Sequence, residues 1–174
     1  MIFKRFFEFF PGIAEKETRR ITLRNDPIIP DGEYAFLDCF CEDKDCDCRR
    51  AYFEVLQIDP DYEPIYAATI SYGWEDLSFY LSWSPYTPIE MATKMKGPIL
   101  QPSQRQSSYA ETFLELFVSK FLIDSSYIDR IRRHYTLFKA RLRGKAIKNI
   151  LKEYDIYAPC PCGSGKKLKF CCLG

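Results

Sequence analysis

The sequence predicts an α+β fold, in which an antiparallel sheet precedes a C-terminal helical pair and a short zinc-knuckle tail. Alternating aromatic and polar residues dominate the first half, whereas apolar residues at helical spacing follow from residue 109. Four cysteines then close the chain as C-x-C and C-C. We therefore divide the chain into an α+β domain with a Cys-rich hairpin, residues 1–157, and a metal-binding tail, residues 158–174.

Phenylalanines at helical spacing within residues 1–10 predict a short amphipathic helix that ends at Pro11 and Gly12. Period-two alternation then predicts strands at Tyr34–Cys41, Ala51–Ile58, Ile65–Tyr72 and Leu77–Trp83. The first two strands flank four cysteines and predict a β-hairpin with this group at its tip. Prolines and a glycine predict a long loop from Pro85 to Pro102.

The helical pair is predicted over Tyr109–Leu122 and from about Tyr127 to Glu153. Between the two helices, the Asp124-Ser-Ser sequence supplies residues that cap helix N-termini. The second helix carries an apolar stripe and many arginines. Because apolar stripes at helical spacing most often pack into a core, we interpret this stripe as core.

Charge is unevenly distributed along the 174 residues, although the formal net charge is only +1. Residues 124–174 contain 12 Lys/Arg and 4 Asp/Glu, whereas residues 1–123 contain 13 Lys/Arg and 20 Asp/Glu. The basic part is suited to RNA, a ribosome surface or an acidic protein. The alternative is that it contacts the acidic part of the same chain. Apolar content of 47% and aromatic content of 16% argue against a disordered chain.

No apolar run reaches the length of a membrane span, and charged residues interrupt the apolar stretch at residues 1–10. These features predict a cytoplasmic protein without a membrane span. Because thiols stay reduced in the cytosol, the eight cysteines are better explained as metal ligands than as disulfides. The sequence leaves the oligomeric state open.

Cysteines near the C-terminus predict a zinc site. Cys160, Cys162, Cys171 and Cys172 have a spacing that gathers four thiolates around one tetrahedral ion. Gly163 and Gly165 permit the tight turn between the two pairs. Because four protein ligands leave no open coordination position, this site is predicted to be structural.

The segment Cys160-Pro-Cys162-Gly-Ser-Gly-Lys-Lys-Leu-Lys-Phe-Cys171-Cys172 resembles the SEC-C motif, first recognised at the C-terminus of the bacterial translocation ATPase SecA. The resemblance covers about fifteen residues, and Leu168 stands where the motif usually has an aromatic residue. It implies Zn²⁺ bound by these four cysteines, and protein contacts like those that SecA makes with a chaperone and the ribosome. The stretch around Cys41–Arg50 also resembles otherwise uncharacterised bacterial proteins that carry this motif.

The hairpin cysteines predict a second metal site. Cys39 and Cys41 share one face of a strand, as do Cys46 and Cys48, so a hairpin tip can gather them. The second resemblance implies that Cys41, Cys46 and Cys48 are the recurring ligands. The fourth ligand is then either Cys39 or His134, the only histidine of the chain. The alternative for the whole group is a set of buried free thiols.

No motif of a known enzyme class is found, and we predict that the protein is not an enzyme. The leading hypothesis is a cytoplasmic zinc-binding adaptor that uses the knuckle and the basic helix to contact a protein, either a chaperone or a ribosome-associated partner. Lys166, Lys167 and Lys169 would form the contact surface or offset the charge of the thiolates. A nucleic-acid-binding module is the alternative, and an enzyme of unknown type is third.

Overall fold

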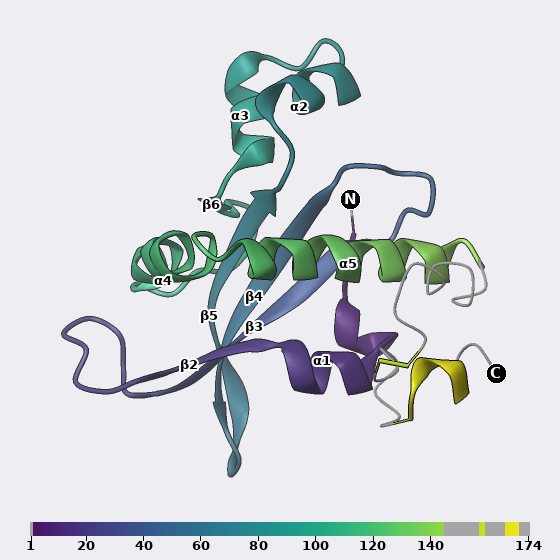
Figure 1. Cartoon of the computed structure of the whole chain (residues 1–174). Helices are drawn as coiled ribbons and strands as arrows, with labels where there is room; N and C mark the ends of the chain where they lie inside the picture. The colour runs from purple at the N-terminus through teal and green to yellow at the C-terminus, as the bar shows by residue number, and fades with distance from the viewer. Residues whose placement is uncertain (1, 145–156, 159–165, 171–174) are drawn as a thin grey trace.

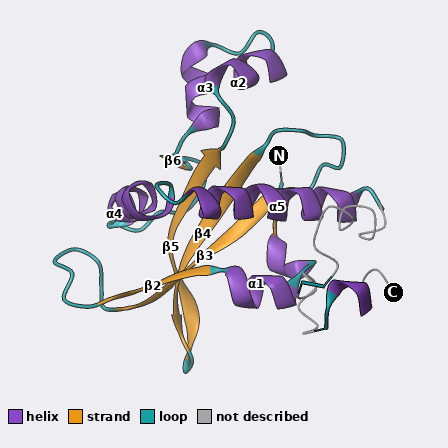
Figure 2. Cartoon of the chain, viewed as in Figure 1, coloured by secondary structure: helices purple, strands orange, loops and turns teal. Residues whose placement is uncertain are grey.

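The structure of the protein is a computed structural model that describes residues 2–144, 157–158 and 166–170. These residues form a mixed α/β fold with one six-stranded antiparallel sheet and five α-helices (Figures 1 and 2). The strands are β1 (Phe3–Arg5), β2 (Arg19–Leu23), β3 (Gly32–Cys41), β4 (Arg50–Asp59), β5 (Tyr62–Gly73) and β6 (Ile99–Leu100). The helices are α1 (Pro11–Glu17), α2 (Leu77–Trp83), α3 (Ile89–Lys96), α4 (Ala110–Leu116) and α5 (Ser125–Leu142).

Strand β3 organises the sheet, whose order is β1-β3-β4-β5-β6. Both β1 and β2 pair with the edge of β3 that faces away from β4. Strand β2 pairs with the first half of β3, where Arg19 lies opposite Phe36, and β1 pairs with the end of β3, where Phe3 lies opposite Cys41. The three long strands match the predicted strands at 34–41, 51–58 and 65–72. The predictions of an antiparallel sheet and of the cysteine-bearing hairpin are therefore confirmed.

The hydrophobic core lies between one face of the sheet and the helices α1, α4 and α5, which all cover that face in Figure 1. Phe53 of β4 contacts Phe117, with ring centroids 4.8 Å apart, and Phe40 of β3 contacts Phe138 of α5 at 5.5 Å. Because strand side chains alternate, Tyr52 and Glu54 point to the opposite face. One face is thus core, and the other is free to carry polar side chains.

The predicted N-terminal helix over residues 1–10 is wrong. Residues 3–5 form strand β1, residues 6–8 form a short 3-10 turn, η1 (Phe6–Glu8), and α1 begins at Pro11, where the prediction placed a helix end. Proline at the first helical position costs no hydrogen bond, because that amide lies outside the helical ladder. Phe6 and Phe10 are both buried and stack with centroids 5.0 Å apart, which explains the helix-like spacing.

Two further predictions around residues 77–102 are also wrong. The segment Leu77–Trp83 is helix α2 and not a strand, because Asp76 caps it: its Oδ1 accepts a hydrogen bond from the backbone N–H of Phe79 at 2.9 Å. The predicted loop contains helix α3 and strand β6. Helices α2 and α3 project beyond the end of β5 (Figure 1).

Helix α4 continues into a π-helical turn, η2 (Phe117–Phe121), and together they fill the segment predicted as helical over 109–122. The predicted N-cap is confirmed, because Asp124 accepts a hydrogen bond from the backbone N–H of Ser126 at 3.0 Å. Helix α5 ends at Leu142, before Gly144 with a φ of 63°. The remaining residues predicted as helix, 145–153, lie outside the described residues, as does most of the tail.

Within the part of the chain that the structure describes, no helix combines the length and the apolar character that crossing a membrane requires.

Candidate metal centre

Three cysteine sulfurs meet at the end of the β3–β4 hairpin. The Sγ atoms of Cys41, Cys46 and Cys48 all lie within 4.8 Å of one another. Cys41 and Cys48 are buried, whereas Cys46 is partly exposed. Two thiolates on one zinc ion are about 3.8 Å apart, given Zn–S bonds of about 2.3 Å in a tetrahedron. The three thiols therefore need to move by only about 1 Å or less to share one ion.

The loop between the strands is built to turn sharply. The backbone N–H of Asp45 donates to Oδ1 of Asp43 at 2.9 Å, and the N–H of Cys46 donates to the carbonyl of Asp43 at 3.2 Å. Arg49 has a φ of 47°, which reverses the chain just before β4. Asp43 thus serves as a turn residue, and the turn brings Cys46 back toward Cys41.

Three side chains spaced four residues apart hold this loop, two from helix α5 and one from Arg143, the residue that directly follows it. The Tyr135 hydroxyl donates to Oδ1 of Asp47 at 3.1 Å, Lys139 Nζ donates to the carbonyls of Cys41 and Asp43 at 2.9 and 2.7 Å, and Arg143 Nε donates to the carbonyl of Lys44 at 2.7 Å. Because residues i, i+4 and i+8 lie along one helix face, a single face binds the whole loop. We call these three residues the α5 clamp.

Burial is the largest influence on the thiols of this group. Burial, together with the neighbouring Cys46 and Cys41, raises the pKa of Cys48 to about 12. Burial also raises the pKa of Cys41, although the backbone N–H of Asp43 and the ammonium of Lys139 partly oppose it. A bound cation would reverse this balance, because metals displace thiol protons. The arrangement can therefore hold a thiophilic metal ion.

Cys39 is not part of this group. It shares the strand face of Cys41, but it lies opposite Tyr52 in the register, and its Sγ donates to the carbonyl of Leu37 at 3.6 Å. Burial, followed by the charges of Glu54 and Asp38, raises its pKa well above the usual value. The structure thus separates Cys39 from the other three hairpin cysteines.

His134 is also outside the group, because both of its ring nitrogens are engaged elsewhere. Nδ1 lies 2.6 Å from Oδ2 of Asp38, and Nε2 lies 2.8 Å from Oε2 of Glu17. The ring stacks on Phe6 with centroids 4.1 Å apart, and Arg133 pairs with the same Glu17 carboxylate. We call Glu17, Asp38, Arg133 and His134 the ion cluster. Neither predicted fourth ligand joins the sulfurs that the structure brings together.

The predicted tail site, Cys160, Cys162, Cys171 and Cys172, lies outside the described residues. The neighbouring lysines Lys166, Lys167 and Lys169 are described and exposed. Lys169 donates to the Tyr157 hydroxyl at 3.4 Å, and Lys167 lies 5.9 Å from the centre of the same ring. These lysines are accessible, as a contact surface requires.

The α5 clamp is the functional feature that sequence reasoning missed. Tyr135, Lys139 and Arg143 belong to a segment in which the sequence analysis distinguished only an apolar stripe and many basic residues. Their spacing of four along this segment was the available signal. Lys139 is only 3% exposed, which a sequence of many lysines does not reveal.

No family model, curated protein or solved structure matches the chain.

Proposed function

We propose that the protein is a zinc-binding adaptor in which one ion, held by Cys41, Cys46 and Cys48, fixes the β3–β4 hairpin on helix α5. The observation that carries this proposal is the convergence of the three sulfurs within 4.8 Å. Zinc is favoured over hard cations because the ligands are thiolates. A structural ion of this kind contributes directly to the free energy of folding.

Charge balance supports a divalent ion at this place. Three thiolates and one Zn²⁺ carry a formal charge of −1, and the buried ammonium of Lys139 lies on the carbonyl of Cys41. A buried charge is costly unless a partner offsets it. Zinc, three thiolates and Lys139 would together be neutral, whereas Lys139 beside three neutral thiols would leave a buried cation bound only to carbonyls.

The adaptor role rests on the tail. The resemblance of residues 160–172 to the SEC-C motif implies a second zinc ion held by Cys160, Cys162, Cys171 and Cys172. The accessible lysines Lys166, Lys167 and Lys169 would then present positive charge to an acidic protein surface, such as that of a chaperone or a ribosome-associated partner. In this proposal the hairpin ion stabilises the domain, and the tail carries the contact surface.

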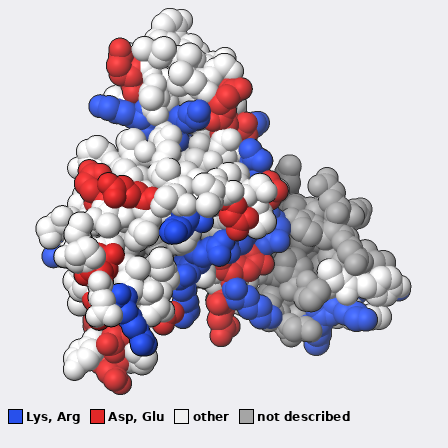
Figure 3. Space-filling view, turned by 60° about the vertical axis from the view of Figure 1, so that its left-hand side comes forward, with Lys and Arg blue, Asp and Glu red and all other residues white. Residues whose placement is uncertain are grey.

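The nucleic-acid alternative needs a free basic surface, and part of the basic side of the described chain is engaged in internal contacts. Arg133 pairs with Glu17, Lys139 is buried against the hairpin loop, and Arg143 binds the carbonyl of Lys44. Figure 3 shows basic and acidic side chains side by side across the middle of this face. The pair between Arg133 and Glu17 agrees with the alternative in which the basic part meets the acidic part of the same chain.

Metal analysis tests the hairpin site. We expect one to two equivalents of zinc in the purified protein, and the loss of about one equivalent in Cys46→Ser. Cys39→Ala is the matched control, because Cys39 is a buried cysteine of the same strand that lies outside the group. Equal zinc content in the wild type and Cys46→Ser would contradict the hairpin site.

Partner capture tests the adaptor role separately. We expect the full-length protein to retain an acidic protein partner that the variant Lys166→Ala/Lys167→Ala/Lys169→Ala loses. Both proteins should carry the same amount of zinc, because the variant keeps every cysteine. A partner retained equally by both proteins would place the contact surface elsewhere.

A further inference from the structure

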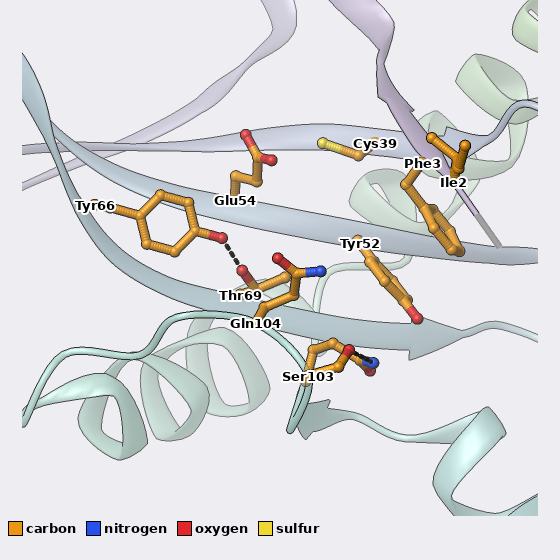
Figure 4. A pocket seen from close by; sticks show the side chains of 10 residues that line it. Ile2, Phe3, Cys39, Tyr52, Glu54, Tyr66, Thr69, Ser103 and Gln104 are labelled. Atoms are coloured by element: carbon orange, nitrogen blue, oxygen red, sulfur yellow. Dashed lines mark hydrogen bonds between the residues drawn. The ribbon is translucent and has the colours of Figure 1, made fainter.

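A hollow of about 520 Å³ lies on the face of the sheet opposite the helices. Cys39, Tyr52 and Glu54 form its floor with Thr69 and Tyr66 of β5, and Gln104 from the segment after β6 lies over them (Figure 4). Ligand sites for small molecules usually have volumes of about 300–1,000 Å³. We call this cavity the sheet hollow, and it shares no residue with the cysteine group.

Aromatic rings bound the sheet hollow at its two ends. Phe3 stacks on Tyr52 at one end, with centroids 3.6 Å apart and ring planes 8° apart. Tyr66 lies at the other end, opposite Leu56, which is four residues beyond Tyr52 along β4. At about 3.3 Å per residue, the two ends are about 13 Å apart. This length suits a ring with one substituent of similar size.

Polar groups converge beside Tyr66. In Figure 4 the Tyr66 ring, the Glu54 carboxylate and the Gln104 amide surround the same part of the sheet hollow. Arg5 binds Oε2 of Glu54 at 2.6 Å, which leaves Oε1 to accept a hydrogen bond from a ligand. The exposed Gln104 amide can both donate and accept. The site therefore offers one ring face and two groups able to bind the edge of a planar ring.

Charge narrows the class of ligand. Glu54 is the one carboxylate among the residues that line the sheet hollow, and no lysine or arginine is among them. Arg5 is already paired with this carboxylate, so an anionic ligand such as a phosphate ester would find no unpaired cation in the described lining. A ring that carries N–H donors and no negative charge fits the lining.

We infer that the sheet hollow binds an uncharged, planar, nitrogen-containing heterocycle of nucleoside size. Its ring lies against Tyr66, its N–H groups donate to Glu54, and Gln104 binds the same ring edge. Stacking on one aromatic side chain and hydrogen bonds at the edge are the interactions by which proteins hold single bases. This inference is independent of the metal centre.

Calorimetric titration of the full-length protein with adenosine and cytidine, beside their 5′-monophosphates, tests the inference. We expect saturable binding of at least one nucleoside, and binding of its monophosphate that is weaker by about tenfold because of Glu54. Equal or tighter binding of the monophosphate would overturn the inference, as would the absence of binding by both nucleosides.

Two variants test the assigned contacts. Glu54→Gln should weaken nucleoside binding by about tenfold, and Gln104→Ala by about fivefold, as expected for losing a charged and a neutral hydrogen bond. Gln104 is exposed, so its variant should keep the fold even if Glu54→Gln loses stability. Arg105→Ala, one residue away and outside the lining, is the matched control and should bind like the wild type. Binding that Gln104→Ala and Glu54→Gln both leave unchanged would place the ligand elsewhere.

Discussion

Two buried polar groups lie along helix α5, and they differ in whether their charges are already balanced. In the ion cluster, two carboxylates meet Arg133 and His134, and each ring nitrogen of His134 has a carboxylate partner. In the cysteine group, three thiols face one another, and the α5 clamp binds the loop carbonyls and Asp47. The ion cluster is complete within the chain, whereas the cysteine group gains most from an added cation.

This difference explains why His134 is a poor candidate for the fourth ligand. A metal-binding imidazole needs one nitrogen free of a proton, with the other held by an acceptor. Both nitrogens of His134 lie within 2.8 Å of carboxylate oxygens, which favours the doubly protonated imidazolium. Neighbouring residues on one helix thus serve separate purposes: His134 is in the ion cluster, and Tyr135 is in the clamp.

The largest expected effect is on the cysteine group. Cys46→Ser should abolish metal binding at the hairpin. If free zinc is a thousandfold above the dissociation constant of the wild-type hairpin site, this loss should destabilise the domain by about 4 kcal/mol. For a domain of this size, that lowers the melting temperature by roughly 10 °C. Thermal unfolding followed by circular dichroism measures the change.

The control for this prediction is the tail. Cys171→Ser should leave the melting temperature of the domain almost unchanged, because the buried core is formed by residues 6–138. If Cys46→Ser and Cys171→Ser melt alike, the hairpin cysteines are buried thiols without a structural ion.

A substitution in the ion cluster should have the next largest effect on the stability of the domain. His134→Gln removes the buried imidazolium between Asp38 and Glu17 and should cost about 3 kcal/mol at pH 6, as breaking a buried ion pair does. Zinc content should stay at the wild-type value, because His134 is not in the cysteine group. Urea unfolding with parallel metal analysis measures both quantities, and loss of zinc would return His134 to the ligand set.

The difference in unfolding free energy between the wild type and His134→Gln should depend on pH. Burial lowers the pKa of His134, but the hydrogen bonds and charges of Asp38 and Glu17 outweigh it, so the pKa is raised above 6.5. A raised pKa means that the stabilisation is fully present below pH 6.5 and is lost as the pH rises through the folded-state pKa. The difference between wild type and His134→Gln should therefore shrink in alkaline solution. A difference that is constant from pH 6 to pH 9 would show that the pKa of His134 is not raised in the fold.

Lys139 should have a smaller effect that is specific to the cysteine group. Lys139→Met leaves the carbonyls of Cys41 and Asp43 without their donor and should cost about 2 kcal/mol. It should also weaken zinc binding, because the bound centre loses its neighbouring positive charge. Competition with a coloured zinc chelator measures this, and the exposed Arg141→Met is the matched control on the same helix. Unchanged zinc affinity in Lys139→Met would separate the clamp from the metal.

Arg143 should have the smallest effect. It is exposed and binds a single carbonyl, that of Lys44, so Arg143→Ala should cost about 0.5 kcal/mol. Urea unfolding resolves a change of this size only if the wild type and the variant have the same m-value, the slope of the unfolding free energy against urea concentration. A loss comparable to that of Lys139→Met would mean that Arg143, directly after α5, fixes the loop as strongly as Lys139 does.

Local sequence patterns predicted the hairpin but not the buried polar contacts between the sheet and helix α5. Tyr34, Phe36 and Phe40 recur at even positions, and Cys39 and Cys41 flank Phe40, so the strand and the placement of these cysteines at its end followed from period two alone. Asp38 interrupts the same apolar alternation on the core face, which signals a buried partner. Its partner, His134, is 96 residues away, and no local rule predicts such a pair.

The wrong predictions share a cause. Aromatic residues in Leu77–Trp83 and in residues 1–10 gave periodicities that favoured the wrong element, because tertiary packing decides the structure of short apolar segments. Capping chemistry was the more reliable signal. Asp124 was predicted as an N-cap, and Asp76, at the start of the segment predicted as a strand, caps α2 in the same way.

X-ray absorption at the zinc edge tests the central claim most directly. The sample is the full-length variant in which Cys160, Cys162, Cys171 and Cys172 are all replaced by serine, so that the hairpin provides the remaining thiols. We predict about one equivalent of zinc with three sulfur neighbours at about 2.3 Å and one lighter neighbour. A variant that binds no zinc, or zinc without sulfur neighbours, would contradict the assignment of Cys41, Cys46 and Cys48 as a metal centre.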